Sequence, residues 1–479
     1  MNICSSSGGP FGKRQGEKDI MKNHGGEQDQ EKTERRPQIG ATRRVLLAGA
    51  VSGAAGAMCT TAFRTFSGRN ESASEHSVIS PFTGLADHVA LHIVGGSDID
   101  SVTAHENVLK IWQETPGVPD QIDTNFEGLG GDSNAQLESV LPKLKGPESP
   151  DLIIVDPEYL PLLASQRLIT PFTNTDRGTL INSGCFNRII ERCYFDHKLH
   201  AIPIHADAPV LAINKSYLKK EHRAAVKQLR SQASPNNFWL KVFEMASSTE
   251  FPPENKIKFE TSDYEGLTTC LIELIFAFGG VVHEDTTLKE EKTRQAIGSL
   301  RKSLKNYDLG QAFQNPAIGM SGTASCKEED VMRALENDET AFARLWPAHR
   351  TDLTKNLDQI EWIPIPGGTL GGQVMALSKR SKEPRLSEEL ARYLCSPLSQ
   401  LALLYHGGYV PSLKQLHSDK KMADFDSLKE AMEVGALRPQ TSRYNEWSRD
   451  FRSSVRNYLL GNGEELGAIT DALSKYERV

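Results

Sequence analysis

The stretch Pro150-Asp151-Leu152-Ile153-Ile154-Val155-Asp156 decides the fold, because its uninterrupted apolar run predicts a β-strand that is buried on both faces. Two earlier strands are predicted at residues 89–96, where the alternation ends in a Gly-Gly pair, and at residues 122–126. Helical spacing separates these strands at residues 108–112 and 135–144. Strand, helix, strand, helix, strand is the order of a doubly wound α/β sheet, which binds ligands at the carboxyl ends of its strands.

The later half of the chain is richer in predicted helix. Ser262-Asp263-Tyr264-Glu265 has the capping-box pattern and is expected to open a helix that ends at Gly279-Gly280. Trp239 is assigned to the core. Further helices are predicted at residues 294–305, 387–394, 397–405, 445–460 and 464–476, and extended segments at residues 200–204 and 209–213.

Length and charge limit the kind of protein. A chain of 479 residues that is 38% hydrophobic and 24% charged can bury two substantial cores. The formal charge of -7 comes from interspersed acids and bases, without a basic run that alternates with aromatic residues. Nucleic acid is therefore not an expected partner.

The N-terminus is predicted to direct export. Residues 1–41 lack hydrophobic periodicity and are expected to be disordered. Residues 42–59 place Arg43-Arg44 before a short apolar run and resemble a twin-arginine export signal. The alternative, a single membrane anchor, is disfavoured because the run falls short of the ~20 residues of a bilayer span. Residues 60–87 are expected to be a tether.

Cys59 follows Ala57-Met58 and resembles a lipoprotein processing box, although Met58 stands where a small residue is expected. Lipidation of Cys59 and soluble release after Ala57 are both open. The predicted location is the periplasm or the outer face of the cytoplasmic membrane.

No pattern of reactive residues predicts an enzyme. The chain has neither a His-Glu-x-x-His zinc motif nor a Gly-x-Ser-x-Gly elbow, so we expect no catalytic residues, no cofactor and no metal. The seven cysteines have irregular spacing, and those beyond Cys59 are expected to be mostly buried thiols. Cys185 and Cys193, with His197 and His200 nearby, fit no standard zinc finger; a local disulfide or plain burial is favoured instead.

Several landmarks recur in one order along the chain. Together they resemble the extracellular solute-binding proteins of ABC importers, in particular the group with maltose- and trehalose-binding proteins, over nearly all of residues 88–478. The landmarks are Gly95-Gly96-Ser97-Asp98, residues 150–156, Ala201-Ile202-Pro203, residues 210–215, residues 239–244, residues 276–280, residues 341–347, Ile365-Pro366-Gly367, Leu370-Gly371-Gly372, residues 407–412 and Arg438-Pro439.

This resemblance implies a two-lobed periplasmic-binding-protein fold of type II, in which each lobe is a doubly wound sheet flanked by helices. Lobe one would hold residues 88–206 plus 374–412, and lobe two residues 207–373 plus 413–479, with the hinge at the crossings. A monomer would close on a small polar solute, a mono- or oligosaccharide, and deliver it to ABC permease subunits. A sensor that presents its closed form to a histidine kinase is the second hypothesis, and a secreted glycan hydrolase the third.

Four acids are candidate acceptors for sugar hydroxyls. Asp98, Glu127 and Asp156 follow predicted strands, and Asp207 lies between two extended segments. For any one of them, a solvated loop acid or a helix cap is an equal alternative.

The remaining candidates come from the resemblance. Trp346 matches a position that often stacks on the ligand, Gly372 belongs to a landmark, and Tyr444 and Trp447 lie where the family commonly supplies another aromatic. Packing between helices is the alternative for both tryptophans, strongest for Trp447. Arg438 would bind either ligand oxygens or a carboxylate of lobe two.

Two departures from the family leave the ligand class open. Val94 stands where many sugar binders have an aromatic residue, and Gln373 stands where tryptophan is frequent. A smaller, more polar or acidic solute is therefore an alternative, and Arg438 would suit an anion.

Overall fold

The computed structural model describes residues 82, 85–96, 102–173, 178, 180, 184–231, 234–313, 326–353, 357–425, 427–461 and 465–476. Its internal contacts divide the chain after residue 56, and every described residue belongs to the second unit, Ala57–Val479. The predicted tail, export signal and most of the tether, together with Cys59 and Asp98, lie outside the described residues. Within the described part, no helix combines the length and apolar character of a membrane span.

Among the described residues, the larger sheet has six strands in the order β2-β1-β3-β11-β4, with β7 also paired to β11. β1 pairs in parallel with β2 and β3, whereas β11 runs antiparallel to β3, β4 and β7. The strand order reverses at β1, which is where open α/β sheets bind ligands. The strands are β1 (Val89–Gly96), β2 (Ile122–Leu129), β3 (Leu152–Val155), β4 (Ile169–Thr170), β7 (Ala201–Pro203) and β11 (Val374–Ser378).

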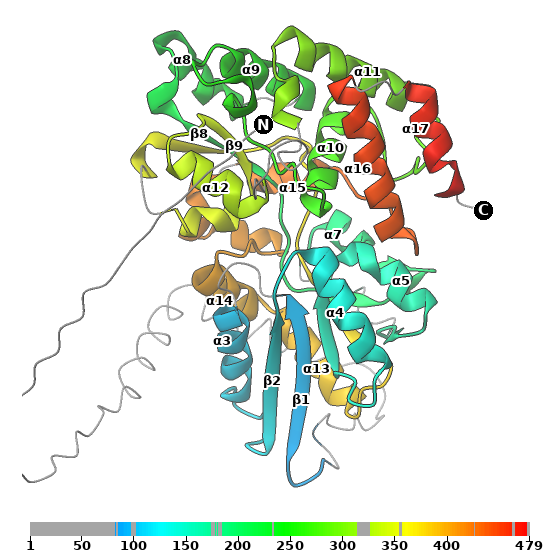
Figure 1. Cartoon of the computed structure of the whole chain (residues 1–479). Helices are drawn as coiled ribbons and strands as arrows, with labels where there is room; N and C mark the ends of the chain where they lie inside the picture. The colour runs from blue at the N-terminus through cyan, green and yellow to red at the C-terminus, as the bar shows by residue number, and fades with distance from the viewer. Residues whose placement is uncertain are drawn as a thin grey trace, which may run out of the picture. The chain divides into compact units, whose positions relative to one another are not determined.

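Helices cover this sheet. α3 contacts β2 and packs against α13 and α14, whereas α4 packs against β1 and β3 (Figure 1). The larger sheet and its helices therefore have the doubly wound arrangement that the sequence predicts. Its helices are α3 (Val102–Gln113), α4 (Ser133–Lys145), α5 (Leu160–Ser165), α7 (Asn187–Glu191), α13 (Pro384–Leu394) and α14 (Pro397–Gly407), and β5 (Tyr194–Phe195) pairs with β6 (Lys198–Leu199) beside them.

The second sheet has three strands among the described residues, in the order β10-β8-β9, and both pairings are antiparallel. The expectation of a doubly wound sheet in lobe two is wrong in this respect: β8 precedes β9 and β10 by more than 100 residues, and it pairs with both of them in antiparallel. The strands are β8 (Val210–Asn214), β9 (Phe342–Leu345) and β10 (Ile360–Pro364).

Most helices outside the larger sheet's segments lie on the side of the second sheet, whereas α15 contacts α7 (Figure 1). α12 packs on β9, and α10 packs against α9, α11 and α16. They are α8 (Lys220–Leu229), α9 (Pro235–Ser247), α10 (Glu265–Ala277), α11 (Glu291–Asn306), α12 (Glu328–Glu336), α15 (Leu428–Val434), α16 (Tyr444–Leu460) and α17 (Leu466–Leu473).

The start of α10 differs from the prediction. Tyr264 is its N-cap residue and makes no side-chain cap, so the capping box predicted at residues 262–265 does not form. The hydroxyl of Ser262 instead accepts from the Cys326 N–H at 2.7 Å. Glu265 is thus free of the capping role that its spacing suggests.

The described cysteines are buried thiols. Cys185, Cys193, Cys270, Cys326 and Cys395 are all free, so the disulfide alternative for Cys185 and Cys193 is wrong. Burial raises the pKa of Cys185 to about 12, and the thiol therefore stays protonated and unreactive at neutral pH.

Three chain segments meet where the part of the chain that forms the larger sheet joins the part that forms the second sheet. The Gly371 N–H donates to the Asp207 carbonyl at 2.8 Å, and the Ala206 N–H donates to the Val410 carbonyl at 3.0 Å. Gly372 has φ +95°, and a Cβ there would lie 2.5 Å from the Ala206 Cα. Only glycine fits this contact without a backbone shift. We keep the predicted boundaries at residues 206, 373 and 412 as a working definition of lobe one and lobe two.

Candidate functional site

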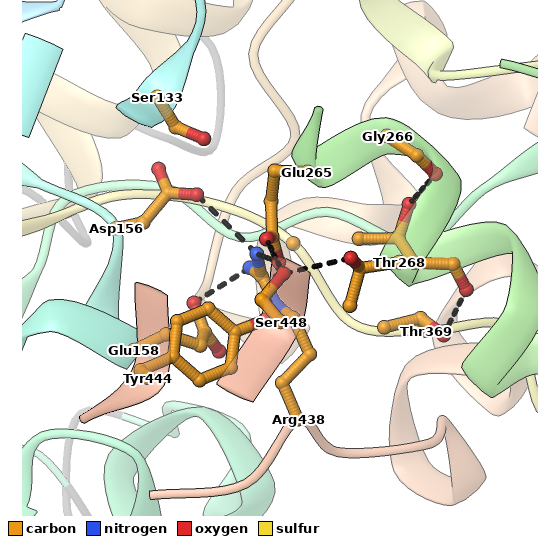
Figure 2. Close-up of polar contacts among 12 residues, drawn as sticks. Ser133, Asp156, Glu158, Glu265, Gly266, Thr268, Thr369, Arg438, Tyr444 and Ser448 are labelled. Atoms are coloured by element: carbon orange, nitrogen blue, oxygen red, sulfur yellow. Dashed lines mark hydrogen bonds and ion pairs between the residues drawn. The ribbon is translucent and has the colours of Figure 1, made fainter. Parts of the chain in front are cut away.

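Arg438 is a buried cation that contacts both lobes. Its side chain is 3% exposed, and its Nη1 lies 3.0 Å from Glu265 Oε1 and 3.4 Å from Asp156 Oδ2. Its Nη2 lies 2.6 Å from Glu158 Oε2 (Figure 2). Asp156 and Glu158 follow β3 in lobe one, whereas Glu265 begins α10 in lobe two. One guanidinium therefore joins the lobes through three carboxylates.

A short turn supplies two of these acids. β3 ends at Val155, and the 3-10 helix η1 (Pro157–Tyr159) follows at once, with Pro157 at its first position. The fixed φ of proline suits the start of a helical turn. The turn holds Asp156 and Glu158, two residues apart in sequence, within reach of the same guanidinium.

Glu265 is the hydrogen-bonded centre on the lobe-two side. The Tyr444 hydroxyl donates to its Oε1, and the Ser448 hydroxyl donates to its Oε2 at 2.7 Å (Figure 2). Ser448 also shares a 2.7 Å hydrogen bond with Thr268. With Arg438 as a further donor, the charge of Glu265 is well satisfied although the residue is buried.

The network continues from Tyr444 into lobe one. The Tyr444 ring meets that of Tyr159 edge to face, with centroids 6.1 Å apart. The Tyr159 hydroxyl donates to Asn134 Oδ1 at 2.8 Å and to Ser133 Oγ at 3.3 Å, at the start of α4. An aromatic contact followed by hydrogen bonds thus connects α16 to the N-terminus of a lobe-one helix.

Arg192 ties Glu158 to the crossing segment. It donates to Glu158 Oε1 through Nε at 3.1 Å and also through Nη2. Its Nη1 donates to the Gly371 carbonyl at 2.8 Å. Glu158 is therefore held between Arg192 and Arg438, and its position depends on the segment that links the lobes.

Electrostatics fix the protonation states of Arg438 and Tyr444. Burial opposes the charged form of Arg438, but Glu158, Tyr444, Glu265 and Asp156 hold its pKa well above the ordinary value. Burial, followed by the charge of Glu265, raises the pKa of Tyr444 far above its usual range. The guanidinium thus stays charged and the phenol stays a donor at neutral pH.

A second cluster surrounds Arg344 in β9. Its Nη1 lies 2.6 Å from Glu260 Oε1 and its Nη2 lies 3.5 Å from Glu273 Oε2, all in the core. The guanidinium stacks on the Trp346 ring, 4.1 Å from its centroid. Trp346 Nε1 donates to Glu328 Oε1 at 3.2 Å. Trp346 is half-buried.

The neutral imidazole of His349 accepts a hydrogen bond from the backbone of Trp346. Its Nδ1 accepts the Trp346 N–H at 3.1 Å, in the turn η5 (Pro347–Thr351). Burial lowers the pKa of His349 to about 4. This histidine therefore adds no positive charge near Glu328 at neutral pH.

A second ionic contact joins the lobes at Asp132. Its Oδ2 lies 2.8 Å from Lys327 Nζ, while its Oδ1 accepts the Ala135 N–H at 3.1 Å and caps α4. The Lys327 ammonium also lies 5.3 Å from the Tyr264 ring centroid. The Tyr264 hydroxyl in turn donates to Glu260 at 2.6 Å. The Arg344 cluster is thereby connected to lobe one.

The other predicted residues lie in different surroundings. Glu127 pairs with Lys143 at 2.7 Å and His92 at 3.3 Å, away from the Arg438 network. Asp207 is buried at the crossing, next to Gly371. Trp447 is fully buried, donates to the Thr286 carbonyl at 2.7 Å and stacks on Phe451, as a core residue does. Trp239 is also fully buried, which confirms the prediction that it lies in the core.

The two positions at which the sequence departs from the family are both buried. Val94 is fully buried in β1, and Gln373 is buried with its Oε1 3.4 Å from His205 Nε2. Neither position supplies an aromatic face. Of the three candidate aromatic residues, Trp346 is half-buried, whereas Tyr444 and Trp447 are buried.

Sequence reasoning missed several members of the two clusters. Glu158, Arg192 and Glu260 belong to none of the landmarks, and Arg344 lies in the landmark of residues 341–347 without having been singled out. Only the proximity of Glu158 to Asp156 and of Arg344 to Trp346 in sequence could have drawn attention to them. Glu265 was explained as a capping residue.

Comparison with known proteins identifies the family. Residues 121–430 match the family model described as bacterial extracellular solute-binding protein, and the chain belongs to this family. A curated relative, the probable ABC transporter-binding protein of Deinococcus radiodurans, is 28% identical over 299 residues, which cover 57% of this chain and 67% of the relative.

Solved structures share the fold. The maltose-bound MalE3 of T. maritima has a TM-score of 0.62 at 18% identity, over 81% of this chain and 98% of that one. The sugar-binding protein MalE of Xanthomonas citri also reaches 0.62, at 16% identity, over 81% and 96% of the two chains. A solute-binding protein from Thermotoga lettingae bound to α-D-tagatose reaches 0.60 at 18% identity, over 81% and 98%. The predicted two-lobed binding-protein fold is thus confirmed.

Proposed function

We propose that this chain is the solute-binding component of an ABC importer and that it holds a carbohydrate between its lobes. The observation that carries the proposal is the Arg438 network, in which Asp156 and Glu158 of lobe one meet Glu265 of lobe two. The printed names of the Deinococcus relative and of the sugar-bound structures support the transporter and the ligand class.

A solute between the lobes would favour the closed form. Contacts to both lobes exist together only when the lobes meet, so the solute binds that form more tightly and shifts the population towards it. A permease that recognises the closed form would then respond to the loaded protein. The hinge would be the crossing at Asp207 and Gly371, where the segments are already hydrogen-bonded.

The proposed solute contacts use two kinds of side chain. Asp156, whose side chain is 18% exposed, would accept hydroxyl hydrogen bonds at the carboxyl end of β3. Trp346, which is half-buried, would stack its ring on the weakly apolar face of a sugar. Tyr444, Arg438, Gly372 and Asp207 would shape the site, and Asp98 stays in the proposal from its position after β1. We leave out Glu127 and Trp447 because of their surroundings.

An acidic solute is disfavoured. Arg438 is engaged by three carboxylates, and Arg192 by Glu158 and a carbonyl. A carboxylate or phosphate ligand would have to displace these buried partners and leave them without a countercharge. A polyhydroxyl solute has no such cost.

The proposal also includes a non-catalytic, monomeric protein that acts outside the cytoplasm and is exported by the predicted twin-arginine signal. Lipid attachment at Cys59 and soluble release after Ala57 are the two alternatives for its mature form. The family is described as extracellular, which supports this location. The solute would be released chemically unchanged.

A thermal-shift screen with mono- and disaccharides, polyols, sugar phosphates and amino acids tests the function. A ligand that binds only the folded state raises Tm, so we expect a shift with at least one carbohydrate. Isothermal titration then gives its Kd, and the recovered sugar should be intact by mass spectrometry. A shift with anions alone, or turnover of the sugar, would disprove the proposal.

Substitution locates the site. Trp346→Ala and Asp156→Ala should each weaken binding of that sugar by about tenfold or more. Glu446→Gln, in an exposed ion pair on α16, is the control and should bind normally. Wild-type affinity in both site variants would place the solute elsewhere.

A further inference from the structure

A pocket of about 370 Å³ lies at the edge of the larger sheet, where β4 pairs with the end of β11. Its wall combines the end of α5, β4, the β5–β6 hairpin and the residue after β11. β11 runs antiparallel to β3 and pairs Leu377 with Leu152, so the pocket lies towards the amino end of β3. Asp156 follows the opposite, carboxyl end of β3. The pocket is therefore separate from the proposed solute site.

Three positively charged side chains line this pocket. They belong to Arg167, Lys198 and Lys379, and all three are exposed. Within the described part of the chain, none of these side chains donates a hydrogen bond or forms an ion pair. Asp196 also lines the pocket but pairs with none of them. The three charges are therefore available to a bound anion, whereas the guanidinium groups of the two clusters described above contact carboxylates.

Backbone contacts fix two of these cations beside each other. The Lys379 N–H donates to the Leu168 carbonyl at 2.9 Å, one residue after Arg167. The Arg167 N–H donates to the Ala164 carbonyl at 2.9 Å, and its φ is 56°. A left-handed backbone is unfavourable for residues with a side chain and persists where the surrounding structure fixes it. The backbone positions of Arg167 and Lys379 are therefore set by the end of α5 and the end of β11.

A tight hairpin supplies the third cation. Lys198 pairs with Phe195 across the β5–β6 hairpin, whose two turn residues are Asp196 and His197. Both turn residues have positive φ, at 47° and 59°, as the favoured two-residue hairpin turns require. The register of this short hairpin fixes the place of Lys198 in the pocket wall.

His200 adds a neutral imidazole to the pocket wall. The residue is 7% exposed, and its Nδ1 has no hydrogen-bond partner among the described residues. Burial, followed by the charge of Lys198, lowers the pKa of His200, so the ring is uncharged at neutral pH. A buried polar group without a protein partner is commonly satisfied by a water or an ion. This histidine therefore gives the wall a polar group besides the three cations.

The size and the lining of the pocket suit a small organic phosphate. Small-molecule sites span roughly 300–1,000 Å³, and this pocket falls within that range. A guanidinium binds phosphate oxygens as a fork, and ammonium groups bind them as point charges. The half-buried ring of Phe195, together with Ile169 and Pro171, adds an apolar wall for a short carbon skeleton.

We propose that this pocket is a second binding site of the protein, which takes the phosphate group of a small phosphate ester. Arg167, Lys198 and Lys379 surround the phosphate, and the apolar wall contacts the carbon skeleton. A free ester and the headgroup of an anionic phospholipid share this chemistry. The site is independent of the proposed solute site, where buried carboxylates already occupy the cations.

Calorimetric titration of the full chain with glycerol phosphate tests the site, with neutral glycerol as the matched probe. Sedimentation with vesicles of phosphatidic acid, against vesicles of phosphatidylcholine, tests the lipid headgroup. We expect glycerol phosphate to bind and glycerol not to bind. Binding to the phosphatidic acid vesicles alone would also support the phosphate site and would identify a lipid as its ligand. Equal binding of glycerol, or binding of neither phosphate probe, would overturn the proposal.

Substitutions separate this pocket from the solute site. Arg167→Gln and Lys379→Gln should each weaken phosphate binding by about tenfold, the factor expected for one hydrogen bond to a charged group. Lys220→Gln removes the same charge from an exposed lysine of α8, outside the pocket, and should bind normally. Trp346→Ala should also keep the wild-type phosphate affinity.

Two results with these variants would overturn the second site. An equal loss of phosphate affinity in Lys220→Gln and the pocket variants would show a general effect of charge. Wild-type affinity in both pocket variants, with weaker binding by Trp346→Ala, would place the phosphate at the proposed solute site. Failure of the carbohydrate screen would refute the proposed function and leave the phosphate results unchanged.

Discussion

Arg438 is the residue whose removal should be most damaging. Its guanidinium is buried against Asp156, Glu158 and Glu265, and a buried ion cluster is strongly destabilised when one charge is removed alone. We expect Arg438→Met to lower the free energy of unfolding by about 3–5 kcal/mol. Urea denaturation measures this loss. Arg443→Met, which breaks an exposed ion pair, is the control, and equal stability of the two variants would contradict the assignment.

Glu273 should make stability depend on pH. Burial raises its pKa from 4.5 to about 7 in the folded state, so the folded chain binds more protons than the unfolded chain between these values. Its contribution therefore weakens stability as pH rises from about 5 to 8, by on the order of 2 kcal/mol.

Glu273→Gln cannot titrate, and its stability relative to wild type should increase over the same pH range. Urea denaturation at pH 5, 6, 7 and 8 measures the difference, with Glu446→Gln as the control. A difference that does not vary with pH would show that Glu273 has an ordinary pKa.

The sequence predicted some site candidates that the structure brings together and missed their partners. Asp156, Arg438 and Tyr444 were singled out, and they share one network. Glu265 was missed as a site residue because the spacing in Ser262-Asp263-Tyr264-Glu265 also fits a capping box. Glu158 could not be found because its partner Arg438 lies 280 residues away in sequence, and no local pattern encodes that contact.

Among the connecting elements, the segment that crosses between the lobes requires a glycine at position 372. Gly372 has φ +95° and a Cβ there would lie 2.5 Å from the Ala206 Cα, whereas Gly117 has a similar φ of +99° and open space around it. Gly117→Ala should therefore cost only the backbone strain of about 1–2 kcal/mol, and Gly372→Ala should cost clearly more. Thermal unfolding of both variants measures the difference, and equal losses would show that crowding at Gly372 is relieved at no cost.

The strands of the larger sheet were predictable because each carries its own signal. The apolar run of residues 152–155 and the alternation of residues 89–96 correspond to β3 and β1. The antiparallel order of β8, β9 and β10 was not predicted, since it depends on pairing between segments more than 100 residues apart for β8 with β9. Local periodicity identifies a strand but not its distant partner.

At the scale of the whole molecule, Asp132 couples a helix cap to the contact between lobes. Asparagine caps a helix as well as aspartate does, so Asp132→Asn should keep α4 intact but lose the charge that pairs with Lys327. We expect weaker sugar binding, by no more than about fivefold, with little change in stability.

Asp132→Ala loses both roles and should in addition lower the free energy of unfolding by about 1 kcal/mol. Isothermal titration and urea denaturation of the two variants separate these effects. Tighter binding by Asp132→Asn would mean that the ion pair with Lys327 opposes closure.

The central claim is that a solute is clamped by groups from both lobes and leaves unchanged. The most direct measurement is a crystal structure of the protein with the sugar that raises its Tm. We predict intact sugar in contact with Asp156 from one lobe and Trp346 from the other. A sugar bound to one lobe alone, or a cleaved product in the density, would contradict the account.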